Sequence, residues 1–213
     1  MSIRTNLMEH QNNILDFIKN KKYFGIFADY GLGKTLCALA YINLYKFRKI
    51  LIVSTKTSIE STWPDEIKKH TDFQYVILTG IRKHKLNQLY LGLRKSMISS
   101  SPYHSEKQNV TLFLINFDGV KNIFDELIQA DFDFIVVDEA TKIKSPKTDR
   151  TKALWKLGSY INRRCIMTGF PVTENISNLY SQIKFIDKGA SFGQSYYGFM
   201  HTYFNKVAFN YCP

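Results

Sequence analysis

Eight consecutive residues near the N-terminus have the types and spacing that hold a phosphate group. The run Ala28-Asp29-Tyr30-Gly31-Leu32-Gly33-Lys34-Thr35 fits the pattern GxxxxGK[ST], with alanine in place of the first glycine. Gly31 and Gly33 allow backbone N–H groups to turn toward phosphate oxygens. Lys34 can reach the β- and γ-phosphates of a nucleotide, and the Thr35 hydroxyl can ligate Mg²⁺. The alternative is a glycine turn followed by a chance Lys-Thr pair.

Two adjacent acids follow an apolar run later in the chain. Asp138 and Glu139 come directly after Phe134-Ile135-Val136-Val137, and carboxylates at the end of a buried strand are costly without a cation. A Mg²⁺ ion bridged to nucleotide phosphates would supply that cation. Asp138 would hold the metal through water, and Glu139 would orient or deprotonate an attacking water. An exposed turn explains an acid pair alone equally well, but the two motifs together predict a site for ATP and Mg²⁺.

Alternating strands and helices are predicted to position these motifs. Near-continuous apolar runs separated by helical periodicity are typical of an α/β protein, a three-layer parallel sheet with helices on both faces. Ligands of such sheets bind at the carboxyl ends of the strands, where both motifs lie. Strands are expected over 23–27, 50–53, 75–78, 110–115, 134–137 and 164–167. Helices are expected over 6–20, 34–47, 58–69, 82–98, 118–129, 148–158 and 175–186, with Thr57 or Ser58 capping the third and Trp63 in the core.

Composition and charge restrict the function further. The chain has 29 Lys+Arg against 18 Asp+Glu, and the excess is concentrated at 82–107 and 142–164. Two basic patches on a near-neutral body indicate either a polyanion partner or a solvated surface. Three widely spaced cysteines without a CxxC motif argue against a disulfide scaffold and a cysteine zinc site. No apolar run is long enough to span a membrane, so we expect an intracellular protein without a membrane partner.

The combined motifs resemble the first RecA-like lobe of superfamily-two helicases, and within them the Swi/Snf-type DNA translocases, over about residues 5–205. The run 29–35 looks like the "GLGKT" motif I, and 138–144 looks like "DEAH-x-IK", motif II. Residues 50–54, with Trp63 and Glu66 downstream, resemble motif Ia. Thr168-Gly169-Phe170-Pro171, followed by Asn175 and Leu179-Tyr180, resembles motif III. The Ile-Lys after motif II and the asparagine after motif III favour the Swi/Snf branch.

The resemblance implies a RecA-like P-loop lobe of an ATP hydrolase that uses ATP and Mg²⁺ to move on duplex DNA. The catalytic residues would be Lys34, Asp138 and Glu139, and Thr35 and Asp138 would hold the metal. The residues expected to bind the nucleotide are Gln11, in an adenine-reading segment at 7–11, and Asp29, Gly31, Leu32, Gly33, Lys34 and Thr35. Those expected to contact the DNA backbone are Ser54, Thr55, Lys56, Thr79 and Gly80. Coupling of the two sites is expected at Thr141, Thr168 and Gly169.

The sequence also departs from the family pattern. Thr141 replaces the histidine of the DEAH box, and Phe170 replaces the second threonine of TGTP. We expect one lobe over 1–213, with a basic helix-and-loop insertion at 82–109 and an aromatic-rich extension at 188–213. A second RecA-like lobe is absent from this sequence, so it is expected as a partner in cis or in trans. The alternatives are a non-catalytic, nucleotide-dependent binding module for DNA or protein, and an RNA helicase lobe.

Overall fold

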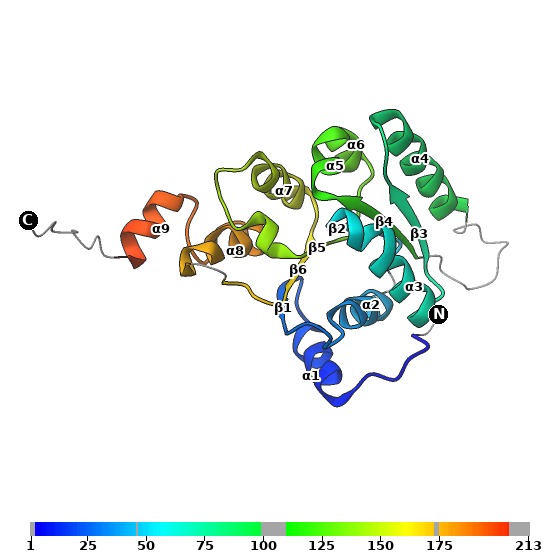
Figure 1. The fold of residues 1–213 in the computed structure, drawn as a ribbon, viewed down its shortest axis with the longest axis horizontal. Coiled ribbons are helices and arrows are strands. Elements are labelled where there is room, and N and C mark those ends of the chain that lie inside the picture. The colour runs from blue at the N-terminus through cyan, green and yellow to red at the C-terminus, as the bar shows by residue number, and fades with distance from the viewer. Residues whose placement is uncertain (1–2, 46, 99–109, 173–174, 205–213) are drawn as a thin grey trace, which may run out of the picture.

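A six-stranded, all-parallel sheet forms the centre of the computed structural model, which describes residues 3–45, 47–98, 110–172 and 175–204. The strand order is β1-β6-β5-β2-β4-β3, and Figure 1 shows the sheet between its helices. Apolar runs make the four inner strands buried on both faces, as parallel sheets require, whereas the two edge strands are partly exposed. The strands are β1 (Tyr23–Phe27), β2 (Lys49–Ser54), β3 (Gln74–Leu78), β4 (Thr111–Asn116), β5 (Phe134–Asp138) and β6 (Arg163–Thr168).

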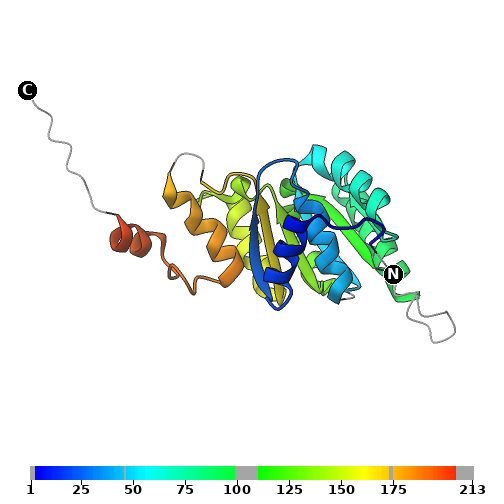
Figure 2. The same cartoon turned by 90° about the horizontal axis from the view of Figure 1, so that it is seen from below.

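Helices cover both faces of the sheet, which confirms the expected three-layer fold (Figures 1 and 2). Alternate side chains of the inner strands enter two cores, as Ile50 and Ile52 do on one face and Leu51 and Val53 on the other. One core is closed by α1 (Glu9–Ile18), α2 (Lys34–Tyr45), the π-helical turn η1 (Ser58–Thr62) and α3 (Trp63–His70). The other is closed by α4 (Arg82–Ile98), α5 (Phe117–Asn122), α6 (Phe124–Gln129), α7 (Asp149–Tyr160) and α8 (Leu179–Asp187).

Two of the expected helices differ in detail. The helix expected over 118–129 is broken at Ile123, whose backbone (φ −134°, ψ 37°) separates α5 from α6 while its side chain stays in the core. The helix expected over 58–69 begins as η1, and neither Thr57 nor Ser58 caps it. The cap is Thr55, whose hydroxyl accepts a hydrogen bond from the Ser58 N–H at 3.3 Å. Trp63 is fully buried, as predicted.

A buried arginine at the start of β6 ties the sheet to two helix ends. The Arg164 guanidinium donates hydrogen bonds to the carbonyls of Gly158 (3.1 Å), Ile161 (2.8 Å) and Ile186 (2.8 Å). The neighbouring Arg163 donates to the Tyr41 hydroxyl at 2.8 Å. Both side chains therefore lie at the amino end of β6, opposite the strand end that leads into the motif at 168–171.

The structure describes only part of the expected basic insertion at 82–109 and of the expected aromatic-rich extension at 188–213. Helix α4 packs on the sheet through Leu89, whereas residues 99–109 of the expected insertion lie outside the described residues. In the C-terminal segment, α9 (Tyr196–Tyr203) lies beyond α8 (Figure 1). Its Phe199 ring is 5.1 Å from that of Tyr180, whereas Tyr197 is 81% exposed. Among the described helices, none combines the length and apolar character needed to cross a membrane.

Candidate nucleotide site and adjoining pocket

All six strands end at one edge of the sheet because they run in the same direction. The predicted motifs follow these ends, so the topology places them in a row along the edge. From β1 to β3 this row consists of the 28–35 loop, Thr168-Gly169, Asp138-Glu139, Ser54-Thr55-Lys56, Asn116 and Thr79-Gly80. The nucleotide motifs therefore occupy one end of the row and the expected DNA contacts the other.

The 28–35 loop has the backbone of a phosphate cradle. Gly31 (φ 79°) and Gly33 (φ 72°) adopt the left-handed conformation that other residues rarely take. A Cβ atom at Gly31 would meet nothing within 4 Å, so the loop is open at this point. The Lys34 ammonium closes the loop by donating to the carbonyls of Ala28 (2.7 Å) and Asp29 (3.0 Å). Because α2 begins at Lys34, its N-terminus adds a positive dipole end, and the cradle fits an anionic phosphate group.

Helix α1 is fastened to this loop through Gln11. The Gln11 carboxamide accepts a hydrogen bond from the Met8 N–H at 3.0 Å and donates to the Leu32 carbonyl at 3.4 Å. A Cβ atom at Gly33 would overlap the Gln11 amide. His10 also reaches the Leu32 carbonyl, with its Nε2 at 3.2 Å. Sequence reasoning named Gln11 but not His10, because no motif marks the histidine.

Asp138 is held by four hydrogen-bond donors. Its Oδ2 accepts from the Ser54 hydroxyl (3.0 Å), the Ser58 hydroxyl (3.4 Å) and the Trp63 indole N–H (3.1 Å). Its Oδ1 accepts from the Glu139 N–H at 2.9 Å. Hydrogen bonds to an ionised acceptor are the stronger kind, so these donors fix the position of the Asp138 side chain. The sequence pointed to Asp138 but gave no sign of its three side-chain donors, which come from residues 75 to 84 positions away.

Glu139 has an unusual backbone and a perturbed carboxyl group. Its φ of 53° is a left-handed value, rare for a residue with a side chain and common at functional sites. Burial raises the pKa of the Glu139 carboxyl, and the negative charge of Asp138 raises it further; Lys34 and Lys142 act in the opposite direction. A carboxyl group with a raised pKa is suited to accept a proton from water.

Two of the three expected coupling residues, Thr168 and Gly169, lie at the end of β6, the strand between β1 and β5 in the sheet. The Thr168 carbonyl, at the end of β6, accepts a hydrogen bond from the Ala28 N–H at 3.4 Å. A Cβ atom at Gly169 would lie 3.3 Å from the Tyr30 ring, so the tyrosine covers this glycine. Phe170 extends the contact, with its ring centroid 5.9 Å from that of Tyr30. Thr141 is half-buried in η2 (Ala140–Ile143), directly after the acids.

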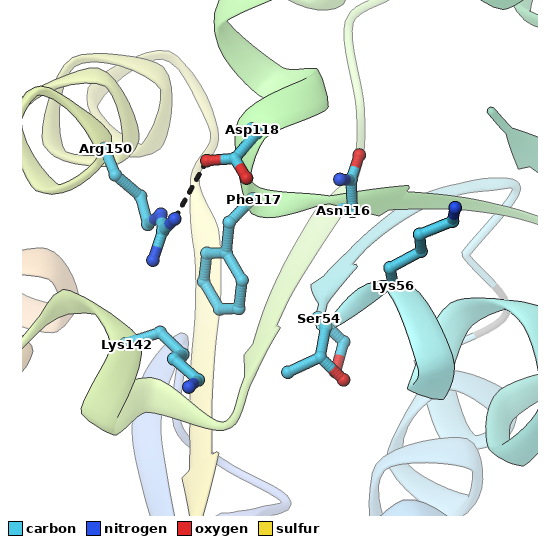
Figure 3. A pocket seen from close by; sticks show the side chains of 8 residues that line it. Ser54, Lys56, Asn116, Phe117, Asp118, Lys142 and Arg150 are labelled. Atoms are coloured by element: carbon cyan, nitrogen blue, oxygen red, sulfur yellow. Dashed lines mark hydrogen bonds and ion pairs between the residues drawn. The ribbon is translucent and has the colours of Figure 1, made fainter. Parts of the chain in front are cut away.

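A pocket of about 230 Å³ opens next to Asp138, over the ends of β2 and β4 (Figure 3). Arg150, at the start of α7, donates to the Asp118 carboxylate at 2.8 Å and lies over the Phe117 ring. The Arg150 Nε is buried without a hydrogen-bond partner among the described residues. With three cationic side chains against one acid, the pocket suits an anion. Its lining consists of Ser54, Thr55, Lys56, Asn116, Phe117, Asp118, Lys142 and Arg150.

The structure places the five expected DNA contacts in two separate regions. Ser54, Thr55 and Lys56 line the pocket, although Ser54 is fully buried and its hydroxyl is bonded to Asp138. Thr79 and Gly80 lie two strands away, beyond β4, and do not line it. There the Thr79 N–H donates to the Gln88 side chain at 2.9 Å. Sequence reasoning marked Arg150 as part of the basic stretch 142–164 but missed Asn116 and Asp118, which the order of the sheet brings beside β2.

The side chains available for a metal suit Mg²⁺ bound together with a nucleotide. Across the described residues, no group of three or more His, Cys, Asp or Glu side chains could hold a metal by itself. Mg²⁺ is often bound by one or two protein ligands while phosphates and waters complete its shell. The Thr35 hydroxyl and the Asp138 carboxylate would supply those ligands, and the charge of the ion would offset that of the acid pair.

Comparisons with known proteins give a consistent result. A family model described as "SNF2-related domain" matches residues 10–207. The chain is 26% identical over 209 residues to protein p41 of Acyrthosiphon pisum secondary endosymbiont phage 1, covering 93% of this chain and 43% of p41. It is 27% identical to the SWI/SNF-related matrix-associated actin-dependent regulator of chromatin subfamily A-like protein 1 of Xenopus tropicalis, covering 84% of this chain and 17% of that protein. The chain thus spans less than half of these relatives.

Solved structures share the fold. The Sulfolobus solfataricus SWI2/SNF2 ATPase core in complex with dsDNA matches 94% of this chain with a TM-score of 0.71 at 20% identity. The match covers 39% of that chain. The likeness confirms the expected RecA-like architecture.

Proposed function

The chain belongs to the SNF2-related domain family, and we propose that it is the ATP-binding lobe of an enzyme that couples ATP hydrolysis to movement on duplex DNA. One observation carries the proposal: the phosphate cradle, the acid pair and a cationic pocket follow each other along one edge of the sheet. The related Sulfolobus solfataricus core was solved in complex with dsDNA, which supports the same partner here. Such an enzyme would act inside the cell.

The residues of the nucleotide end have distinct proposed roles. The loop amides and Lys34 would bind the phosphates, and Thr35 and Asp138 would hold the metal. Bound Mg²⁺ would supply positive charge to the phosphate oxygens. Glu139 would accept a proton from the attacking water.

A complete ATPase of this kind also needs an arginine finger, worth about 10³–10⁵ in rate. Arg163 and Arg164 are bonded at the opposite end of β6 and do not supply it. We therefore propose a second RecA-like lobe, in cis or in trans, as the partner that does.

The pocket would bind the phosphate backbone of DNA. Lys56, Lys142 and Arg150 supply positive charge, and the Asn116 amide adds a donor that does not depend on charge. Backbone contacts of this kind position a protein on DNA without reading the bases. The expected binding is independent of sequence and weakens steeply with salt.

A second candidate is a nucleotide-dependent binding module that does not hydrolyse ATP. Thr141 and Phe170 favour it, because they replace the two side chains through which the family connects the metal site to motif III. In such a module ATP would still bind, but duplex DNA would not stimulate turnover in the presence of the second lobe.

The test measures ATP binding by calorimetry and ATP hydrolysis with duplex DNA and the second lobe. Lys34→Ala should abolish detectable Mg-ATP binding, and Asp138→Asn should weaken its Mg²⁺ dependence. Glu139→Gln should retain ATP but block turnover. Lys19→Ala, at an exposed lysine paired with Asp16, is the control and should behave as wild type. Wild-type affinity in Lys34→Ala would contradict the nucleotide site, and ATP binding by the wild type without DNA-stimulated turnover would favour the binding module.

A further inference from the structure

We propose that Trp63, Ser58 and Ser54 are positioning residues that transmit occupancy of the cationic pocket to the Asp138 carboxylate. The inference rests on the proposed function, since it takes Asp138 as a metal-binding residue and the pocket as a polyanion site. It adds a defined connection between the two, made of hydrogen-bond donors from one short segment. These donors belong to none of the expected coupling residues.

The connection consists of three donors on one oxygen. Ser54, Ser58 and Trp63 all donate to Asp138 Oδ2, at 3.0, 3.4 and 3.1 Å. Trp63 is fully buried, so water cannot replace its N–H as a donor to Asp138. With three donors, Oδ2 can accept no further hydrogen bond. Oδ1 accepts only from the Glu139 N–H among the described residues. Oδ1 is therefore the oxygen with room for a metal-bound water.

The same segment forms a wall of the pocket. Ser54 and Thr55 line it, and Lys56 follows them. The Thr55 hydroxyl accepts a hydrogen bond from the Ser58 N–H at 3.3 Å, and its carbonyl accepts from the Ile59 N–H at 3.1 Å. A phosphate bound at Thr55 or Lys56 therefore acts on the turn that carries Ser58. Figure 3 shows Ser54 and Lys56 close together on one segment, with Asn116 at the end of the adjoining strand.

The turn that joins these residues has an uncommon geometry. Residues Ser58–Thr62 form the π-helical turn η1, which leads directly into α3 with Trp63 as its first residue. Single π-helical turns are rare and are found often at functional sites. A small change in η1 alters the positions of Ser58 and Trp63 together, and so changes how firmly Asp138 is held. Linkage requires the effect to be reciprocal, so bound Mg-nucleotide also changes the affinity for DNA.

The test compares Trp63→Phe, which keeps an aromatic ring and removes the N–H, with Trp155→Phe. Trp155 is the matched control, because its indole N–H donates to the Ser181 carbonyl at 2.9 Å, away from Asp138. Calorimetry measures binding of the β,γ-imido analogue of ATP with Mg²⁺ and with EDTA, each with and without a short blunt duplex DNA. Thermal unfolding shows whether each variant is folded.

Trp63→Phe should bind the analogue in EDTA as wild type does. Its gain in affinity from Mg²⁺ should fall about tenfold, the effect of losing one hydrogen bond to a charged group. The change that DNA produces in wild type should disappear, while affinity for DNA alone stays within about twofold. Trp155→Phe should match wild type in all four conditions.

Ser58→Ala provides a second variant that does not disturb the core, and Ser61→Ala is its control. The Ser61 hydroxyl donates to the Thr57 carbonyl at 2.8 Å in the same turn, without reaching Asp138. Ser58→Ala should reproduce the loss of coupling, and Ser61→Ala should not. If both tryptophan variants and both serine variants keep the wild-type dependence on Mg²⁺ and DNA, the connection does not exist.

Failure of the proposed function would look different. If wild type binds no nucleotide, or binds no duplex DNA, the function itself is wrong and the inference falls with it. If wild type binds both without any effect of one on the other, the site assignments stand and the proposed connection is wrong.

Discussion

The phosphate loop and the cationic pocket lie on the same edge of the sheet but are built in opposite ways. The loop comes from eight consecutive residues, and its binding groups are mainly backbone amides fixed by two glycines and a helix N-terminus. The pocket comes from four separate segments and is lined by the side chains of lysines, an arginine and an asparagine. One is therefore a local structure, and the other exists only when distant strands are neighbours.

The difference predicts how each site responds to substitution. A backbone site tolerates few changes at its glycines, since any side chain alters the loop itself. In a side-chain site, each substitution removes the part of the binding affinity that one side chain supplies, because each cation contacts the polyanion independently. Substitutions in the loop, in the pocket and in the helix behind the loop should therefore have effects of different size.

The largest effect is expected for Gly33→Ala. The new Cβ would take a backbone with φ 72° and overlap the Gln11 amide, so the loop must change shape. Affinity for Mg-ATP should fall at least about a hundredfold, since the amides that hold the phosphates move, while affinity for duplex DNA should not change. Gly193→Ala is the control, with a φ of 78° and nothing near its Cβ. Calorimetry with ATP compares them, and equal affinities would contradict a backbone-built site.

An intermediate effect, with opposite signs, is expected at the ion pair in the pocket. Arg150→Met should weaken duplex binding. The slope of log affinity against log salt concentration should fall by about one, because one phosphate contact is lost. Asp118→Asn should strengthen binding about two- to fivefold, because it removes the acid that competes for Arg150.

Asp149→Asn serves as the control for Asp118→Asn. It breaks the Lys121–Asp149 pair on the same two helices, outside the residues that line the pocket. Fluorescence anisotropy over a range of salt concentrations measures all three variants. If Asp118→Asn weakens binding or leaves it unchanged, DNA does not reach Arg150.

The smallest effect is expected at Cys37, behind the phosphate loop. Burial raises the pKa of this thiol to about 11, so at pH 8 only about a thousandth is the reactive thiolate. Iodoacetamide should therefore leave Cys37 unmodified at pH 8 in wild type, Arg150→Met and Asp118→Asn alike, and should label it after unfolding in urea. Peptide mass spectrometry measures the labelling. Rapid modification in the folded protein would show that α2 is not the rigid support that the loop needs.

The sequence predicted the local structures and missed those that depend on strand order. The six strands, the phosphate loop and the acid pair were visible because each is a contiguous pattern with a fixed period or spacing. The break at Ile123 was missed, since apolar residues continue through it with helical spacing. Trp63 was predicted as a core residue and as part of the segment that resembles motif Ia, but spacing does not reveal that its N–H reaches a carboxylate 75 positions away. Arg150 was marked only as part of the basic stretch 142–164, and Asn116 was not marked at all, because the two residues meet in one pocket only through folding.

The position of β1 has a consequence for the order in which the molecule forms. In the described sheet β1 is an edge strand, and its only hydrogen-bonded neighbour is β6, whose residues come about 140 positions later. During synthesis the glycine loop emerges early but has no strand beside it until residue 168 has left the ribosome. Closing so long a loop is slow, so a growing chain carries an unpaired strand edge until β6 has been synthesised, and nucleotide can bind only once that closure is complete.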